Sequence, residues 1–131
     1  MGIFSSNRSL NPRQCVKILL QAYRRSEAVT EELVEIILKP ARDPGAIEVF
    51  LAFTGYSGGP LPEDLLPILL CPAILLWGSE DPWEPLPLGQ ELARFPTVKK
   101  FIPLAGLGHC PQDEAPEIVN PILLDFLQAY S

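Results

Sequence analysis

The stretch CPAILLWGSED, residues 71–81, contains the segment that decides the fold. An apolar run of strand length, residues 73–77, lies between Pro72 and Gly78. Strands that are buried on both faces of a parallel sheet have this uninterrupted apolar pattern, whereas strands with one wet face alternate. We therefore predict a buried strand of a parallel sheet over residues 73–77.

The residues that follow predict a βαβ unit and a closing helix. A short helix is expected around residues 88–95 and a second strand over residues 99–104. The last helix is expected over residues 116–130, and at Pro121 it either kinks or restarts with Asn120 as its cap. Helical spacing assigns five apolar side chains to its buried face: Ile118, Ile122, Leu123, Phe126 and Tyr130.

The first half of the chain predicts helices and no strand. Apolar residues recur at helical spacing over residues 12–23, 30–39 and 43–55. Thr30 and Asp43 are the expected N-caps of the last two helices, because a side-chain oxygen at this position can accept a first-turn N–H. The stretch over residues 56–67 is rich in Gly and Pro and predicts an irregular loop.

Composition limits the classes of function. The chain has 131 residues, 47% of them apolar, which suits one compact domain. Ten Lys and Arg against sixteen Asp and Glu give a net charge of −6, and without a basic stripe this argues against nucleic acid as a partner. No apolar run approaches the ~18–20 residues of a membrane span. Three cysteines without metal or redox spacing predict reduced, mostly buried thiols.

Two chemically useful side chains follow the two predicted strands. Asp81 comes directly after the first strand, and His109, the single histidine, comes after the second. The carboxyl ends of neighbouring parallel strands meet at one rim of the sheet, so we expect these side chains to converge. An Asp can fix the tautomer of a His and stabilise the imidazolium that forms when the His takes a proton. The sequence therefore predicts two members of a nucleophile-His-Asp triad.

Other candidates near these residues have simpler interpretations. Glu80 and Glu84 flank Asp81 and are expected to be solvated charges. Cys110 adjoins His109, but neighbouring side chains in a loop generally diverge, so we do not assign it as the nucleophile. Ser57 lies in GYSGG, residues 55–59, which satisfies G-x-S-x-G. A helix precedes it where the elbow needs a strand, so we interpret this stretch as a Gly-rich turn.

The block over residues 71–85 with Asp81, together with Gly108-His109 and the terminal helix, resembles the last two strands of the α/β-hydrolase family. The helical segment up to Pro40 and the stretch YSGGPLP, residues 56–62, are similar to the cap and linker of a plant and cyanobacterial branch related to pheophytinase and epoxide hydrolases. The resemblance covers residues 13–130. It implies an α/β fold: two parallel strands with flanking helices, forming the C-terminal part of a hydrolase sheet, preceded by a helical cap segment.

The resemblance also implies an organisation and an activity. Residues 1–11 are unmatched, residues 12–67 correspond to cap and linker, and residues 68–131 correspond to the C-terminal βαβα part of the core. A full-length member hydrolyses an ester or related bond of a small hydrophobic molecule without metal or organic cofactor, in a plastid or the cytosol. His109 would act as general base and acid, and Asp81 would orient it.

Two features of this interpretation stay open. Phe50, Phe53, Tyr56 and Trp83 either line a substrate pocket between cap and core or serve packing alone. The family's nucleophile elbow and oxyanion hole lie upstream of the cap, so we expect this chain to be inactive by itself. The alternative is a non-catalytic interaction module that docks through its exposed sheet edge. In either case an uncovered strand edge predicts self-association or pairing with an N-terminal half.

Overall fold

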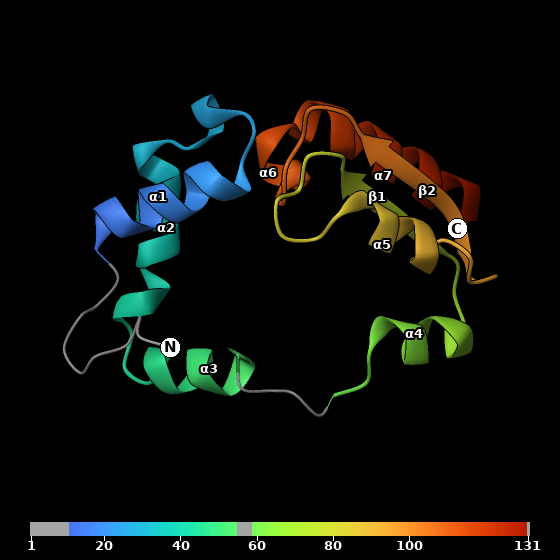
Figure 1. The fold of residues 1–131 in the computed structure, drawn as a ribbon, viewed down its shortest axis with the longest axis horizontal. Helices are drawn as coiled ribbons and strands as arrows, with labels where there is room; N and C mark the ends of the chain where they lie inside the picture. Colours follow the sequence, from blue (N-terminus) through green and yellow to red (C-terminus); the bar gives the residue numbers. More distant parts are fainter. Residues whose placement is uncertain (1–10, 55–58, 131) are drawn as a thin grey trace.

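A computed structural model describes residues 11–54 and 59–130 of the chain (Figure 1). A helical region comes first and contains α1 (Pro12–Ala22), η1 (Ser26–Ala28), α2 (Glu31–Leu38), η2 (Pro40–Arg42) and α3 (Ala46–Thr54). The strands come later, in the order α4 (Pro62–Leu65), η3 (Leu66–Ile68), β1 (Ala73–Gly78), α5 (Leu86–Leu92), β2 (Val98–Leu104), α6 (Pro111–Glu114) and α7 (Pro116–Tyr130).

The first two helices begin where the sequence predicts. Asn11 caps α1, and its side chain accepts the N–H of Gln14 at 2.9 Å. Thr30 caps α2, and its hydroxyl accepts the N–H of Leu33 at 3.1 Å. Each cap satisfies a first-turn N–H that has no partner inside the helix. The helix ends differ from the prediction by one residue.

The third helix starts later than predicted. Asp43 does not cap it, because Pro44 and Gly45 form a tight turn in which Gly45 has φ +84° and the N–H of Ala46 donates to the carbonyl of Asp43 at 3.1 Å. Pro followed by a left-handed Gly is the signature of a type II turn, which favours glycine at this position. The helix therefore begins at Ala46.

The prediction of an irregular loop over residues 56–67 is also partly wrong. Residues 62–68 form α4 and η3, with Pro62 in the first turn. The N–H of Leu61 donates to the carboxylate of Asp64 at 3.0 Å, which fixes the start of this short helix. Residues 56–58 lie outside the described residues.

The two strands pair in parallel, as predicted, with Ala73 opposite Val98 and Gly78 opposite Leu104. Helix α5 packs on one face, where a Cβ on Gly89 would lie 2.6 Å from the Trp77 ring. On the other face, α7 packs against a cluster that includes Leu104. Residues 73–77 are half-buried, not fully buried as expected, because a two-stranded sheet leaves each strand one unpaired edge.

The last helix has the predicted bounds but a different buried face. It runs without interruption through Pro121, so the alternative of a restart at Asn120 is wrong. Val119 and Phe126 are buried and Ile122 is half-buried. Three side chains of the predicted buried face are exposed: Ile118, Leu123 and Tyr130. Packing against the end of β2 centres the contact on Val119, which rotates the buried face away from them.

Two hydrophobic clusters form in residues 11–54 and 59–130. One hydrophobic cluster lies between α1 and α2 and consists of Cys15, Leu19, Ala22, Tyr23, Val34 and Leu38. A second lies between the sheet and α7 and consists of Leu104, Leu107, Ala115 and Val119. Figure 1 shows an open arrangement in which α3 and α4 extend between these two parts. None of the helices in the described part combines the length and apolar character that a membrane span requires.

Candidate functional site

The loops after β1 and β2 meet because the two strands run in the same direction and end level with each other. The N–H groups of Ser79 and Glu80 donate to the carbonyls of Leu104 and Leu107, both at 3.0 Å. A Cβ on Gly78 would lie 1.8 Å from the carbonyl oxygen of Gly108. Only glycine at the end of β1 therefore allows the two loops to approach this closely.

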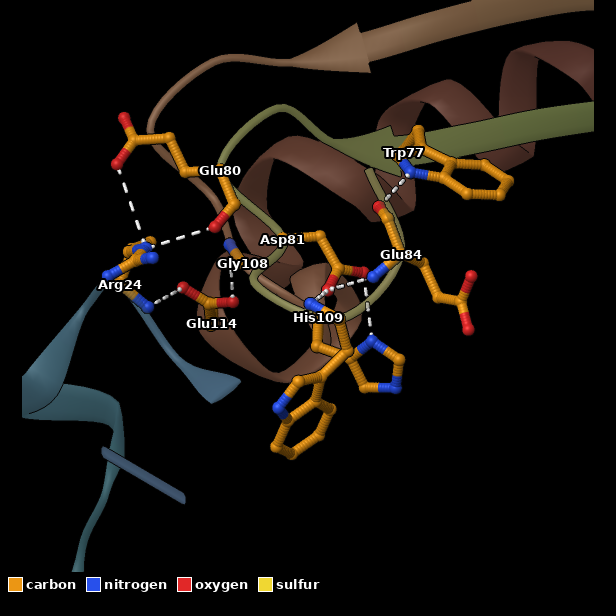
Figure 2. A network of polar contacts seen from close by, with 9 residues as sticks. Arg24, Trp77, Glu80, Asp81, Glu84, Gly108, His109 and Glu114 are labelled. Atoms are coloured by element: carbon orange, nitrogen blue, oxygen red, sulfur yellow. Dashed lines mark hydrogen bonds and ion pairs between the residues drawn. The ribbon is translucent and has the colours of Figure 1, made fainter. Parts of the chain in front are cut away.

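Asp81 and His109 come together at this junction, as the sequence predicts. Nδ1 of His109 lies 2.8 Å from Oδ2 of Asp81 (Figure 2). The other carboxylate oxygen of Asp81 accepts the N–H groups of Trp83 at 2.9 Å and Glu84 at 3.1 Å. The Asp81 side chain is 7% exposed, while that of His109 is 36% exposed. The carboxylate is thus fixed and sheltered, and the imidazole reaches solvent.

The surroundings of Asp81 favour its ionised form. Burial raises the pKa of this carboxyl, but hydrogen bonds from the Trp83 and Glu84 N–H groups and from His109 outweigh burial and lower the pKa below its ordinary value. An ionised carboxylate can only accept hydrogen bonds, so the proton between the two side chains belongs to Nδ1 of His109. Nε2 of the neutral imidazole is then unprotonated and can accept a proton.

Two tryptophan side chains, Trp77 and Trp83, contact the loop that follows β1 and the His109 ring. The Trp83 ring lies edge-on against the His109 ring, with centroids 4.8 Å apart and an interplanar angle of 66°. The indole N–H of Trp77 donates to the carbonyl of Glu84 at 2.9 Å (Figure 2). Trp83 is therefore at the candidate site and is itself exposed.

A shallow hollow opens beside the pair. Its apolar walls come from Leu76, Trp77 and Pro111, and its polar lining comes from Asp81, Glu84 and His109. Pro111 follows the His109 loop and is buried. The hollow places an apolar wall beside one acid-base pair.

Of the other aromatic candidates, Phe50 has a described side chain, and it lies away from the hollow. Phe50 lies on α3, is exposed, and is absent from the lining of the hollow. Figure 1 shows α3 on the opposite side of the open arrangement from the sheet. The side chain of Phe53 lies outside the described residues, as do Tyr56 and Ser57.

Glu80 and Glu84 are exposed, in agreement with the interpretation as solvated charges. Cys110 is half-buried, and burial, with the nearby carboxylates of Asp113 and Glu114, raises the pKa of its thiol although a hydrogen bond with Tyr23 opposes the rise. The thiol form is therefore favoured, and a thiol is a poor nucleophile. Cys15 is buried as predicted, whereas Cys71 is exposed, and all three are free thiols.

Sequence reasoning missed Glu114. Its side chain is 4% exposed and accepts hydrogen bonds from the N–H groups of Gly108, Arg24 and Arg25. No local motif predicts this, because two of the partners lie about ninety residues away. The available signal in the sequence is weak: an acid between Pro111 and Pro116, next to Ala115.

The helical region also reaches the site through the segment that follows α1. The guanidinium of Arg24 donates from Nε to the carbonyl of Glu80 at 3.0 Å. The Tyr23 hydroxyl donates to the carboxylate of Asp113 at 2.9 Å, and burial together with this bond raises the pKa of Tyr23. Within residues 11–54 and 59–130, no group of three or more His, Cys, Asp or Glu side chains is arranged to hold a metal ion.

Comparisons with known proteins point to one fold. No protein-family model matches the chain. An uncharacterized hydrolase of Bacillus subtilis, YugF, is 26% identical over 121 residues, covering 92% of this chain and 44% of that protein. The chloroplastic pheophytinase of Arabidopsis thaliana is 25% identical over 125 residues, covering 90% of this chain and 25% of that protein.

Solved structures give the same result. A meta-cleavage product hydrolase from Pseudomonas fluorescens superposes with a TM-score of 0.73 at 18% identity, covering 93% of this chain and 47% of that one. A bacterial membrane phospholipase A superposes with a TM-score of 0.67 at 21% identity, covering 98% of this chain and 46% of that one. The chain therefore has part of an α/β-hydrolase fold, and it spans less than half the length of these relatives.

Proposed function

We propose that Asp81 and His109 are the acid and base of a serine-hydrolase-type site that cleaves an ester or related bond in a small hydrophobic molecule. The observation that carries the proposal is the 2.8 Å contact between His109 Nδ1 and Asp81 Oδ2. It occurs at the carboxyl ends of two parallel strands, where α/β folds place their functional groups. Both solved structures described above are of hydrolytic enzymes, which supports the reaction class.

In this proposal His109 moves the proton and Asp81 holds the imidazole. Nε2 takes a proton from the nucleophile and later returns it to the leaving group. The ionised Asp81 stabilises the imidazolium formed in between, and its anchoring by two N–H groups keeps it in place during the reaction. Trp83 and the apolar wall of the hollow would contact the hydrophobic part of the substrate.

The nucleophile and the oxyanion hole have to come from elsewhere in the fold. Within residues 11–54 and 59–130, no nucleophilic side chain is hydrogen-bonded to the imidazole. The chain covers 44% of YugF, so the unmatched portion of such a relative has room for both groups. We therefore propose that the 131-residue chain needs a nucleophile-bearing partner segment to catalyse hydrolysis.

The test is an assay with an activated ester on two preparations: the chain alone, and the chain joined to the portion of YugF that it does not match. The chain alone should be no faster than its His109→Ala variant. The joined protein should hydrolyse the ester, and Asp81→Asn or His109→Ala should each lower its rate by about 10³–10⁴-fold. Glu91→Gln, a carboxylate change at an exposed position of α5 outside the hollow, is the matched control and should leave the rate unchanged.

Two outcomes would contradict the proposal. Full activity of the joined protein after His109→Ala would remove His109 from the mechanism. Activity of the chain alone that disappears in Ser57→Ala would make Ser57 the nucleophile and would show that no second segment is required.

A second candidate function, an interaction module, is favoured by exposed apolar side chains. Four of them lie just before β1: Leu65, Ile68, Leu69 and Leu70. Leu124 and Leu127 are exposed on α7. We propose that these surfaces and the sheet edge self-associate unless a hydrolase segment covers them. Sedimentation should show association and a hydrophobic dye should bind, and both should decrease in the joined protein. A monomer that binds no dye would contradict this candidate.

A further inference from the structure

Glu114 is a buried carboxylate whose partners are all backbone N–H groups from two distant segments. Oε1 accepts the N–H of Gly108 at 2.8 Å, while Oε2 accepts those of Arg24 at 2.7 Å and Arg25 at 3.1 Å. Figure 2 shows the carboxylate lying between Gly108 and Arg24. The side chain thus bridges the His109 loop and the segment that follows α1.

The bridge requires a carboxylate. One oxygen accepts a hydrogen bond from the His109 loop, and the other accepts hydrogen bonds from the segment after α1. A buried charged group is tolerated only when its oxygens have hydrogen-bond donors of this kind. A glutamine would keep one oxygen and turn its NH₂ group toward an N–H donor on the other side. The Glu114→Gln substitution would therefore remove either the bond to Gly108 or those to Arg24 and Arg25.

The bridge acts on the backbone that carries the imidazole. Gly108 directly precedes His109, and the N–H of His109 itself donates to the carbonyl of Ala22 at 2.8 Å. A Cβ on Gly108 would lie 2.1 Å from that carbonyl oxygen, so the two segments are in close backbone contact. The donor groups on both sides of the Gly108–His109 peptide bond are thus fixed to residues 22–25 or to Glu114.

We propose that Glu114 is a positioning residue that sets the orientation of His109 toward Asp81 by joining the His109 loop to residues 24 and 25. Its significance for catalysis rests on the proposed function, but the geometric effect does not. Without the bridge, the Gly108 N–H loses its partner and the bond from the His109 N–H to Ala22 is left to hold this peptide, so the imidazole loses its constant approach to Oδ2 of Asp81. The Nδ1-protonated form of the ring, which that contact selects, should then lose population.

Nuclear magnetic resonance can measure this directly, because His109 is the single histidine of the chain. In the wild-type chain, ring ¹⁵N shifts should report the Nδ1-protonated tautomer, and a downfield Nδ1–H resonance should be visible. Glu114→Gln should abolish that resonance and produce a mixture of tautomers. The matched control is Glu117→Gln, the same chemical change at an exposed carboxylate that pairs with the Arg25 side chain, and it should preserve the wild-type ring signals.

A folded Glu114→Gln variant with wild-type ring signals would overturn the proposal. If that variant does not fold, hydrogen exchange in the wild-type chain decides: the N–H groups of Gly108, Arg24 and Arg25 should be protected although they lie outside the helices and strands. Exchange at the rate of unprotected loop amides would overturn the bridge. Failure of the ester assay with a normal response of the ring signals would reject the proposed function and leave the positioning role intact.

Discussion

The helical region, residues 12–54, and the α/β region, residues 73–130, differ in how their apolar side chains are used. In the α/β region, the strand ends, the His109 loop and α7 close around Leu107, which is 1% exposed. In the helical region, α1 and α2 close around a cluster of their own, but α3 leaves Ile47 and Val49 exposed. Apolar side chains therefore form a packed core where strands fix the geometry. They pack only partly where helices contact other helices without a sheet.

The junction between the regions is built from polar backbone contacts. Residues 22–25 meet Gly108, His109 and Glu114 through hydrogen bonds, and glycine at position 108 allows the close approach. The candidate acid-base pair lies on the α/β side of this junction. Its geometry consequently depends on contacts that a small change in backbone position would break.

The largest expected effect comes from Gly78→Ala, which tests whether the α/β region depends on close loop contact. The new Cβ would lie 1.8 Å from the carbonyl oxygen of Gly108 and 2.7 Å from that of Leu107. Both obstacles are backbone atoms that no rotamer change can move, so the free energy of unfolding should fall by about 3 kcal/mol or more. Urea unfolding measures this change.

Gly106→Ala is the matched control for that substitution. Its Cβ would meet no atom within 4 Å, and only the left-handed conformation, φ +73°, opposes it. The expected loss is about 1–2 kcal/mol. A loss for Gly78→Ala that is no larger than this would mean that the two loops do not touch as described.

The second prediction compares the two regions by truncation. Leu107→Ala removes a fully buried side chain of the α/β region and should lower the free energy of unfolding by about 2–5 kcal/mol. Val49→Ala removes a side chain of α3 that is 70% exposed and should change it by less than about 0.5 kcal/mol. Urea unfolding of both variants is the measurement, and equal losses would contradict the contrast between the regions.

Much of the secondary structure could be predicted because its signals are local. Thr30 caps its helix, the bounds of β1 follow from Pro72 and Gly78, and α7 ends where the apolar pattern ends. The turn at Gly45 carried a local signal as well, but Asp43 and Pro44 also fit the start of a helix. Competition between two local patterns explains that error.

Contacts between residues far apart in the sequence were harder to predict than the secondary structure. The contact between Asp81 and His109 could be predicted because parallel strands bring their carboxyl ends together. The buried face of α7 could not, since packing against β2 selected Val119 over Ile118 and Leu123. Glu114 was missed because its role depends on backbone groups of Arg24 and Arg25, whose distance in sequence leaves no pattern.

The third prediction concerns the helical region alone. Thr30→Ala removes the hydroxyl that accepts the N–H of Leu33, so the free energy of unfolding should fall by about 1 kcal/mol. Thr30→Ser keeps an acceptor oxygen and should restore most of that loss. Hydrogen exchange at Leu33 should accelerate in the alanine variant, while the ring signals of His109 should stay unchanged. A change at His109 would show that the two regions are coupled more tightly than their contacts indicate.

The smallest expected effect is on stability at acid pH. It compares two carboxylates: Asp81 inside the α/β region and Glu117 at the junction between the regions. Burial raises the pKa of Asp81, but hydrogen bonds from Trp83, Glu84 and His109 outweigh it, so the folded-state pKa is lowered. The hydrogen bond with Arg25 lowers the pKa of Glu117, whose pair with Arg25 joins the two regions. For each carboxyl, the unfolded chain takes up the proton at a higher pH than the folded chain.

Each carboxylate therefore stabilises the folded chain fully above the ordinary carboxyl pKa, about 4, and this contribution is lost as the pH falls through the folded-state pKa. Urea unfolding from about pH 7 to about pH 3 should show a loss of stability that is flatter in Asp81→Asn and in Glu117→Gln than in the wild-type chain. Opposing effects at Asp81 and exposure at Glu117 keep both changes small. If Asp81→Asn retains the wild-type slope, the carboxylate does not hold its proton as weakly as the contacts with His109 and the loop require.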